Sequence, residues 1–488
     1  MQPGTSIFLM TAILLWCTLG MFMEQLGEKC GIFGIFGKGL AASRLTFFGL
    51  FSLQHRGQES SGIAATDGQE LRSYKNVGLV THAYDEEDIE RLVGHVAIGH
   101  NRYSTSAGTG ITHAQPVVVH SKSGEPLLAL AHNGNLPGVT KLVEFLKTKN
   151  ITTDNLSDSE LIAQVIGWHL NQGTNLRDAI SAVYPLCIGA FSLLVMTKDT
   201  LVAVKDSSGI RPLCMGRLNG GFIFASETCA LTTTGAEFIK ELAPGEMVVV
   251  NDTGVESVQI VPGQLKFDMF EFVYFARHDS VLWGSSVYDV RKNFGEHLAR
   301  AFPVDADIVV PVPETAVPVA VGYAQASGIP LEMALAKNRY IHRTFIQPDQ
   351  HARDLGVKLK LVPLPNILKG KRVVLMDDSI VRGTTSKPLI NAIFEAGAKE
   401  VHFYISSAPV KFPDFYGIDT PRQKDLLASH KSIEEMREFL GATSLRFLSI
   451  DDMVASTGLS REQFCLSCFT GEYPIDIGER WGDVSVVK

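Results

Sequence analysis

Residues 373–385 constrain the fold more than any other stretch, because an apolar strand runs directly into two acids and a polar loop. The sequence there is Val-Val-Leu-Met-Asp-Asp-Ser-Ile-Val-Arg-Gly-Thr-Thr. Its four apolar residues are typical of a central strand in a parallel sheet. Asp377 and Asp378 follow at the carboxyl end, where open α/β sheets bind their ligands. We therefore predict a parallel-sheet domain with a ligand site at this edge.

The loop after the two acids has the composition of a phosphate-binding loop. Its hydroxyls, guanidinium and glycine come from Ser379, Arg382, Gly383, Thr384 and Thr385. A helix is predicted next, over Leu389–Ala396, and helix N-termini and successive backbone N–H groups bind anions. Two acids would repel a bare phosphate, whereas carboxylates bind ribose hydroxyls and Mg²⁺ well. The loop thus favours a sugar phosphate with Mg²⁺, although a strand, a capped helix and a polar turn could look similar.

The segment resembles the phosphoribosyl pyrophosphate (PRPP) motif of type I phosphoribosyltransferases. Ala306–Thr315 resembles the pyrophosphate loop of that family, and Lys337–Tyr340 with Arg343–Pro348 resembles the flexible loop that closes over PRPP. The resemblance implies Mg²⁺ binding by Thr315, Asp377 and Asp378. It implies PRPP binding by Lys337, Arg339, Arg343, Ser379, Arg382, Gly383, Thr384 and Thr385.

The first half of the chain carries a second set of motifs, beginning with Cys30. This cysteine precedes a glycine-punctuated apolar strand and would be a core residue in most proteins. Four polar segments accompany it, at residues 53–62, 99–105, 131–136 and 157–160. Together they resemble the glutamine-binding parts of class II glutamine amidotransferases, which are N-terminal-nucleophile enzymes built as an αββα sandwich. The remaining strands of that sandwich are predicted at residues 191–196, 201–204, 222–225 and 247–250.

The resemblance implies that Cys30 attacks the amide of glutamine. Amide hydrolysis needs a nucleophile, a base and donors for an oxyanion. In this family the base is the α-amine of the nucleophile itself, whose ordinary pKa near 8 suits the transfer. We therefore expect cleavage after Lys29, which makes Cys30 the first residue.

The other glutamine-site residues also follow from the resemblance. The Asn133 side chain and the Gly134 backbone N–H would form the oxyanion hole. Arg102 would pair with the α-carboxylate of glutamine and Asp158 with its α-ammonium. Arg56 would support the nucleophile from nearby.

Taken together, the motifs predict a two-domain chain of mixed α+β and α/β class. Residues 1–29 would be a leader, 30–262 the N-terminal-nucleophile αββα sandwich, and 263–488 a type I phosphoribosyltransferase parallel-sheet domain with a C-terminal tail. Such a chain would pass ammonia from L-glutamine to PRPP and form 5-phosphoribosylamine, the first committed step of de novo purine synthesis. The alternatives are an amidotransferase with another acceptor, such as a hexosamine or asparagine synthetase, and a PRPP-sensing regulatory protein with an inactive glutaminase domain.

Composition restricts the partners and the compartment. The net charge of −8 provides no basic excess for nucleic acid. Seven cysteines without framework spacing suit a reducing cytoplasm. Ile7–Met23 carries no charge but lacks the basic region of a signal peptide, so we expect no stable membrane association and interpret residues 1–29 as removed or as a start-site error. The family resemblance implies a homotetramer inhibited by purine nucleotides.

One part of the sequence departs from the family pattern. Cys465 and Cys468 resemble the tail pair of relatives that carry a [4Fe–4S] cluster, which needs four thiolates. The other two ligand positions match Asp268 and Asp414. A cluster is therefore doubtful, and three possibilities stay open: no metal, an unusual cluster or Zn²⁺.

Overall fold

The structure, a computed structural model, describes residues 30–103, 111–338, 361–418 and 422–485. The chain forms two compact units. Among the described residues, the smaller unit comprises those of Gly295–Ser406 and Lys431–Phe447, and the larger comprises those of 30–294, 407–430 and 448–485. Each unit is discontinuous in sequence, whereas the predicted division after residue 262 is a single cut. The predicted leader, residues 1–29, lies outside the described residues.

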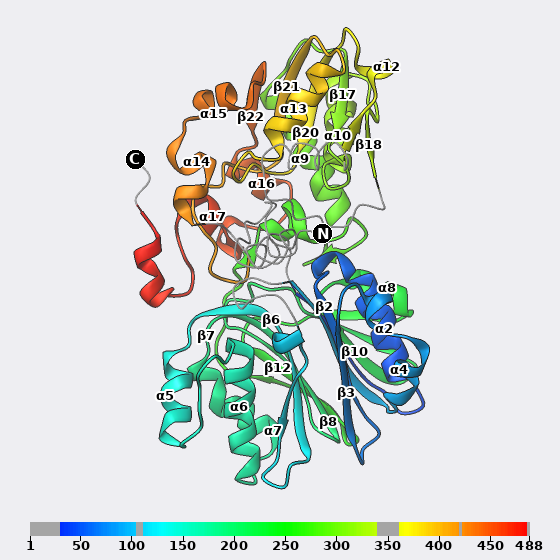
Figure 1. The fold of residues 1–488 in the computed structure, drawn as a ribbon, viewed down its shortest axis with the longest axis vertical. Helices are drawn as coiled ribbons and strands as arrows, with labels where there is room; N and C mark the ends of the chain where they lie inside the picture. Colours follow the sequence, from blue (N-terminus) through cyan, green and yellow to red (C-terminus); the bar gives the residue numbers. More distant parts are fainter. Residues whose placement is uncertain (1–29, 104–110, 339–360, 419–421, 486–488) are drawn as a thin grey trace, which may run out of the picture. The chain divides into compact units, whose positions relative to one another are not determined.

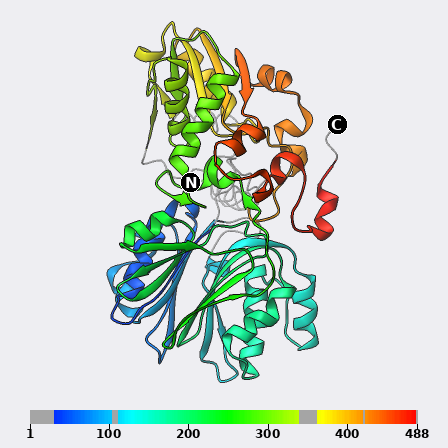
Figure 2. The same ribbon diagram turned by 180° about the vertical axis from the view of Figure 1, so that it is seen from behind.

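The larger unit contains two antiparallel sheets that pack face to face (Figures 1 and 2). The first has the strand order β11 (Glu237–Glu241), β9 (Cys214–Leu218), β10 (Gly221–Ala225), β1 (Gly31–Phe36), β4 (Val96–Arg102), β2 (Ser60–Thr66) and β3 (Leu71–Val77). The second has the order β13 (Gly254–Gln259), β12 (Glu246–Asn251), β8 (Thr200–Lys205), β7 (Ile188–Met196), β6 (Pro126–Gly138) and β5 (Val117–His120). The four strands predicted between residues 191 and 250 are confirmed as β7, β8, β10 and β12.

Helices cover the outer face of each sheet. The first sheet carries α2 (Ala42–Ser52), α3 (Val80–Ala83), α4 (Glu86–Arg91) and α8 (Thr228–Thr234), and the second carries α5 (Thr140–Thr148), α6 (Asp158–Asn171) and α7 (Leu176–Val183) (Figure 1). Three apolar clusters hold these layers together. One lies between the sheets, and its members include Ile32, Ile98, Ala131 and Leu194.

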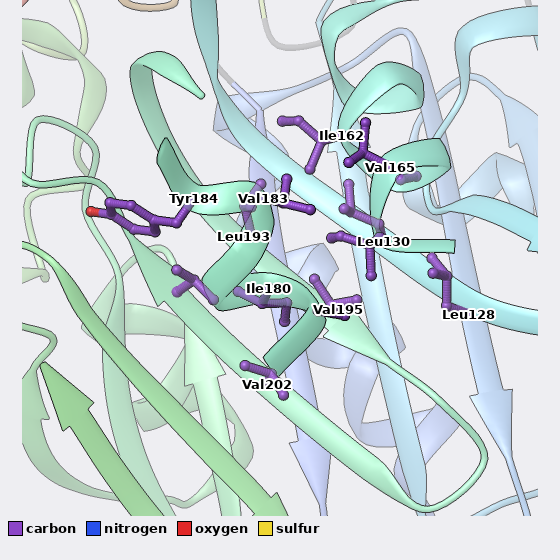
Figure 3. Close-up of a cluster of buried hydrophobic side chains, with 14 of the residues drawn as sticks. Leu128, Leu130, Ile162, Val165, Ile180, Val183, Tyr184, Leu193, Val195 and Val202 are labelled. Atoms are coloured by element: carbon purple, nitrogen blue, oxygen red, sulfur yellow. The ribbon is translucent and has the colours of Figure 1, made fainter. Parts of the chain in front are cut away.

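The other two clusters join a sheet to its helices, and Figure 3 shows the one beneath α6 and α7. There Ile162 and Val165 of α6 and Ile180 of α7 meet the strand residues Leu130 and Val195. Alternating residues of each strand therefore face two different cores, because successive strand side chains point to opposite faces of the sheet. This is the αββα sandwich that the sequence predicted.

Chain segments after residue 262 complete the larger unit. They include β14 (Phe267–Asp268), a π-helical turn at Glu271–Phe275, β15 (Val281–Leu282), β16 (Ser285–Ser286), α14 (Leu427–His430), α16 (Ile450–Ala455), β23 (Phe464–Cys465) and α17 (Ser467–Thr470). The segment around residue 415 packs on β6, where the Asn135 side chain donates a hydrogen bond to the Phe415 carbonyl at 2.8 Å. A Cβ on Gly417, whose φ is +110°, would lie 3.1 Å from the Gly134 carbonyl carbon.

The smaller unit is built on a parallel sheet with the order β17 (Ile308–Pro311), β20 (Arg372–Asp377), β21 (Glu400–Ile405) and β22 (Ser444–Phe447). Its helices include α10 (Val317–Ser327), α12 (Pro365–Leu368), α13 (Ser386–Glu395) and α15 (Ile433–Leu440), and a small hairpin pairs β18 (Leu335–Lys337) with β19 (Leu361–Pro363). Helix α9 (Val287–Ala301) contains the boundary between the units. The predicted parallel-sheet domain is confirmed, and α13 begins three residues before the prediction. Within the described residues no helix has the length and apolar character needed to cross a membrane.

Candidate active site

Cys30 immediately precedes β1, which lies between β4 and β10 in the middle of the first sheet. Burial raises the pKa of its thiol, and Asp158 adds to that effect. A hydrogen bond from the backbone N–H of Tyr103 and the positive charges of Arg102 and Arg56 act in the opposite direction. Because the net shift is upward, the thiol needs a base before it can act as a nucleophile.

The strand pairing brings Arg102 to Cys30. Gly31 of β1 is paired with Asn101 of β4, so Arg102, the last residue of β4, lies beside the start of β1. Arg56 reaches the same place from the turn after α2, and its Nε donates a hydrogen bond to the Cys30 carbonyl at 3.3 Å. The positive charges of both guanidinium groups therefore act on the thiol, and both lower its pKa.

Asn133 and Gly134 lie in β6, which packs against β1 and β4. The Asn133 side chain is buried, and neither of its amide atoms has a hydrogen-bond partner among the described residues. An unpaired buried amide costs free energy, so its retention indicates a ligand that pairs with it. Gly134 has a φ of +155°, and a Cβ there would lie 2.0 Å from the Ala190 carbonyl oxygen. The backbone at this point therefore requires glycine.

Asp158 is the first residue of α6, and a Ser157–Glu160 capping box fixes that end of the helix. The Asp158 carboxylate accepts hydrogen bonds from Leu136 N at 3.1 Å and from Ser159 N at 2.7 Å. These bonds join the start of α6 to β6 and leave the carboxylate within electrostatic range of Cys30. The larger unit thus brings together all the residues that the sequence predicted for the glutamine site.

Two sets of supporting residues were missed by sequence reasoning. His132 Nδ1 lies 3.0 Å from Ser159 Oγ and 3.7 Å from Asp158 Oδ2, and Gln115 bonds both His132 N and Ser159 Oγ. His132 precedes Asn133 in the chain, so its position in the motif was a usable signal. The second set is the pair of glutamates that hold Arg56, at positions 227 and 271, and nothing local in the sequence marks them.

In the smaller unit Asp377 ends β20 and Asp378 follows it, both half-buried. Asp377 Oδ1 accepts a hydrogen bond from Asp378 N at 3.0 Å, and Ser379 Oγ donates to Asp378 Oδ2 at 2.7 Å. The loop continues through Gly383, whose φ of +78° is a conformation that glycine adopts without strain, and α13 begins at Ser386. Arg382, Thr384 and Thr385 therefore lie between a strand end and a helix N-terminus, as predicted for an anion site.

The neighbouring strand supplies the second loop of the predicted PRPP site. Val312 N donates to Met376 O at 2.8 Å, so the loop that contains Thr315 leaves the sheet beside the Asp377 loop. Lys337 Nζ lies 3.6 Å from Glu314 Oε1, which places this lysine next to the same loop. Arg339 and Arg343 lie outside the described residues. The oxygen donors of Thr315, Asp377 and Asp378 are of the type that Mg²⁺ prefers.

The four residues of the suspected cluster site lie close together in the larger unit. Asp268 is paired with Cys465 between β14 and β23, and Cys468 Sγ lies 4.0 Å from Asp414 Oδ2. Both carboxylates already have partners: Asp268 accepts from Arg211 Nη1 at 2.7 Å, and Asp414 accepts from two backbone N–H groups at 2.8 and 2.9 Å. The residues thus do not fit a four-thiolate cluster. Across the described residues no group of three or more His, Cys, Asp or Glu side chains is arranged to hold a metal.

Comparisons with known proteins define the class of the chain. Residues 100–233 match the glutamine amidotransferase domain family, and residues 283–410 match the phosphoribosyl transferase domain family. The chain therefore combines a class II glutamine amidotransferase domain with a phosphoribosyltransferase domain.

Relatives over nearly the whole length identify the family. The amidophosphoribosyltransferase of Synechococcus elongatus is 44% identical over 95% of each chain, and that of Methanocaldococcus jannaschii is 44% identical over 92% of this chain and 98% of its own. The solved structure of the Bacillus subtilis glutamine PRPP amidotransferase, complexed with ADP and GMP, matches with a TM-score of 0.86 and 42% identity. It covers 92% of this chain and 98% of its own. The chain belongs to the amidophosphoribosyltransferase family, whose members are pentosyltransferases of purine biosynthesis.

Proposed function

We propose that this chain hydrolyses L-glutamine at Cys30 and transfers the ammonia to PRPP at the Asp377–Thr385 loop. The products would be L-glutamate, diphosphate and 5-phospho-β-D-ribosylamine. The observation that carries the glutaminase half is the buried, unpaired amide of Asn133 on a strand that packs against the strand that follows Cys30.

At the glutamine site, Arg102 would bind the α-carboxylate of the substrate and Asp158 its α-ammonium. The Cys30 thiol would lose its proton to the α-amine and attack the side-chain carbonyl, so that negative charge develops on the carbonyl oxygen. Asn133 and the Gly134 N–H would stabilise that charge. Ammonia then leaves, and water hydrolyses the thioester to release glutamate.

At the sugar-phosphate site, the loop from Ser379 to Thr385 and the N-terminus of α13 would hold the 5-phosphate of PRPP. Lys337, and the predicted Arg339 and Arg343, would balance the charge of the pyrophosphate. Thr315, Asp377 and Asp378 would hold Mg²⁺, which neutralises charge on the leaving pyrophosphate. Ammonia would attack C1 of the ribose with inversion as the bond to pyrophosphate breaks.

The mechanism requires a free α-amine on Cys30, so we propose that the mature chain begins there. Intact mass spectrometry of the active enzyme tests this point. A mass that starts at Cys30 is expected, and full activity in a chain that retains residues 1–29 would contradict the role of the amine.

Alkylation tests the nucleophile directly. A glutamine analogue with an electrophilic carbon should label Cys30, and peptide mapping should locate the label there alone. Absence of label on Cys30 in enzyme that turns glutamine over would overturn the assignment. Cys187, another cysteine of intermediate exposure in the larger unit, serves as the internal control.

Purine nucleotides and assembly belong to the same proposal. The related Bacillus subtilis enzyme binds ADP and GMP in its solved structure. We infer that this chain also binds purine nucleotides, acts in the cytoplasm and assembles as a homotetramer. The alternative of a PRPP-sensing regulatory protein loses its support, because the relatives that match over nearly the whole chain are enzymes.

A further inference from the structure

A buried network of charged side chains lies behind the proposed nucleophile in the larger unit. It consists of Arg56, Arg211, Glu227, Asp268 and Glu271, and we call it the Arg56 network. Arg56, Arg211, Glu227 and Glu271 are no more than 1% exposed, and Asp268 is 3% exposed. Buried charges at this level are rare unless they are paired.

Every nitrogen of the Arg56 guanidinium has a partner. Glu271 accepts from Nη1 at 2.9 Å and from Nη2 at 2.8 Å, and Glu227 also accepts from Nη1. The remaining nitrogen, Nε, donates to the Cys30 carbonyl. Because a guanidinium is planar and its donors form a rigid fork, these contacts fix both the position and the plane of the group.

The two glutamates are themselves held in place. Glu227 accepts from His55 Nε2 at 2.7 Å, from Ser280 Oγ at 2.7 Å and from Arg277 N at 3.0 Å. Burial opposes ionisation of Glu227, yet the charges of His55 and Arg56 lower its pKa, so it stays ionised. Glu271 accepts from Arg211 as well, and Arg211 is anchored by Asp268 at 2.7 Å.

The network joins distant parts of the sequence. Glu271 belongs to the π-helical turn and Ser280 follows it, whereas Cys30 immediately precedes β1 and Arg56 belongs to the turn after α2. A buried ion pair contributes little net stability compared with apolar residues of similar volume, so a structural role alone explains this arrangement poorly. A positioning role explains it better, because Arg56 Nε donates its hydrogen bond to the backbone carbonyl of the proposed nucleophile.

We propose that Glu271 and Glu227 are positioning residues for glutamine hydrolysis. They hold the Arg56 guanidinium so that its Nε fixes the Cys30 main chain, and the thiol and α-amine are thereby presented to the substrate in one orientation. The inference rests on the proposed role of Cys30. Alkylation of Cys30 in the wild-type enzyme tests that role separately.

Glu271→Gln is the first test, because it removes the charge and keeps the shape. We expect the kcat of glutamine hydrolysis to fall about tenfold, since misplacement of a reacting group is costly. The KM for glutamine should stay within about twofold, because Arg102 and Asp158 are untouched. Synthesis of phosphoribosylamine from PRPP and ammonium should stay at the wild-type rate.

Glu246→Gln is the matched control. Glu246 is 4% exposed and accepts from Lys240 Nζ, Ser257 Oγ and Ala243 N, none of which belongs to the Arg56 network. Its kcat for glutamine should equal that of the wild type. Equal kcat values in Glu271→Gln and Glu246→Gln would overturn the inference, as would an equal fall of the glutamine and ammonium rates in Glu271→Gln.

The pH profile separates positioning from general destabilisation. Removal of one negative charge near Arg56 should favour the deprotonated amine and thiol, so the acid limb of Cys30 alkylation should move to lower pH by about half a unit. An unchanged profile would contradict the proposal.

In the background of Arg56→Lys, Glu271→Gln should cause little further loss of kcat, because both changes act through the same contact. Full additivity would also contradict it.

Ser280→Ala keeps the proposal testable if Glu271→Gln fails to fold. It removes one hydrogen bond to Glu227 and leaves all charges paired. We expect a two- to threefold lower kcat for glutamine with an unchanged KM. Wild-type kcat in Ser280→Ala would overturn the role of Glu227.

The labelling experiment separates this inference from the proposed function. If the wild-type enzyme is not labelled at Cys30, the proposed nucleophile is wrong. If it is labelled and the variants have the same kcat as their control, only the inference about Glu227 and Glu271 is wrong.

Discussion

The two candidate sites differ in how much of their geometry is built before a ligand arrives. The glutamine site consists of strand ends and one helix start, and Arg56 there is paired with Glu227 and Glu271 in the buried core. The PRPP site consists of loops at the carboxyl edge of a parallel sheet, and its two acids are half-buried, with Asp377 bonded to Asp378 N and Asp378 to Ser379 Oγ. A nucleophile must be held in one orientation toward its substrate, and the packed core around it can provide that orientation. A polyanion and its metal are held by hydroxyls, carboxylates and backbone N–H groups, which loops at a strand edge can supply.

The largest expected effect is the loss of glutamine-dependent activity without loss of ammonium-dependent activity. Cys30→Ala should lower glutamine-dependent synthesis by roughly 10³-fold or more, because no other group takes the place of the thiolate. Synthesis with ammonium should continue, because it bypasses Cys30. Assays of phosphoribosylamine formation with each nitrogen source measure both rates, and equal loss of the two would show that the sites are not separable.

The next largest effect tests whether the Asn133 amide stabilises the transition state of glutamine hydrolysis. Asn133→Ala should reduce the kcat for glutamine by about 10²- to 10³-fold, the usual cost of one oxyanion donor. The KM should change little, because the amide pairs with charge that develops during the reaction. Steady-state glutaminase assays provide both constants. A raised KM with normal kcat would assign Asn133 to substrate binding instead.

A change at the PRPP site in the smaller unit should impair phosphoribosylamine synthesis and spare glutamine hydrolysis. Asp378→Asn should reduce synthesis by about 10- to 100-fold with either nitrogen source, because it weakens the proposed Mg²⁺ site. Glutamate release at Cys30 should persist. Titration with Mg²⁺ should show that more metal is needed for half-maximal rate. Glu332→Gln, an exposed acid in the same unit, is the control and should behave as the wild type.

The smallest expected effect concerns the larger unit and the pH dependence of its free energy of unfolding. Burial lowers the pKa of His100 from 6.5 to about 3, and Arg102, His132 and Lys75 act in the same sense, although the hydrogen bond from His100 to the His132 carbonyl opposes it. The folded chain therefore keeps His100 neutral, while the unfolded chain protonates it near its ordinary pKa. This contribution is present above pH 6.5 and is lost as the pH falls toward 3.

His100→Asn should reduce the pH dependence of the free energy of unfolding in that window by up to about 1.4 kcal/mol per pH unit. Denaturant unfolding of the wild type and the variant at pH 5 to 7 measures the two slopes. The exposed His120→Asn should leave the slope unchanged. Identical slopes in His100→Asn and the wild type would contradict a neutral, buried His100.

Local patterns were enough to predict much of both folds. The strand before Asp377 and the strands of residues 191–250 appear where their apolar runs predicted them, because a buried strand needs such a run. The start of α13 was predicted three residues late, since Ser386 and Lys387 carry no apolar periodicity. The glutamine-site residues could be predicted because each belongs to a short motif.

The partners of those residues could not be predicted in the same way. Asp268 resembles a replaced metal ligand in the sequence, yet in the fold it binds Arg211, which is 57 residues earlier in the chain. Glu271 belongs to none of the sequence motifs, yet it binds Arg56. Neither contact has a local signature, because both depend on which strands and turns meet in the core.

Short motifs were enough to predict the reaction class, because Cys30, Asn133 and the Asp377–Thr385 loop each belong to one. Only the fold shows which buried charges meet, as Arg56 does with Glu227 and Glu271. It also decided that segments after residue 406 complete the unit that contains the glutamine site. The physical reason is the range of the interactions: motif geometry depends on neighbouring residues, whereas pairing of buried charges depends on the whole core.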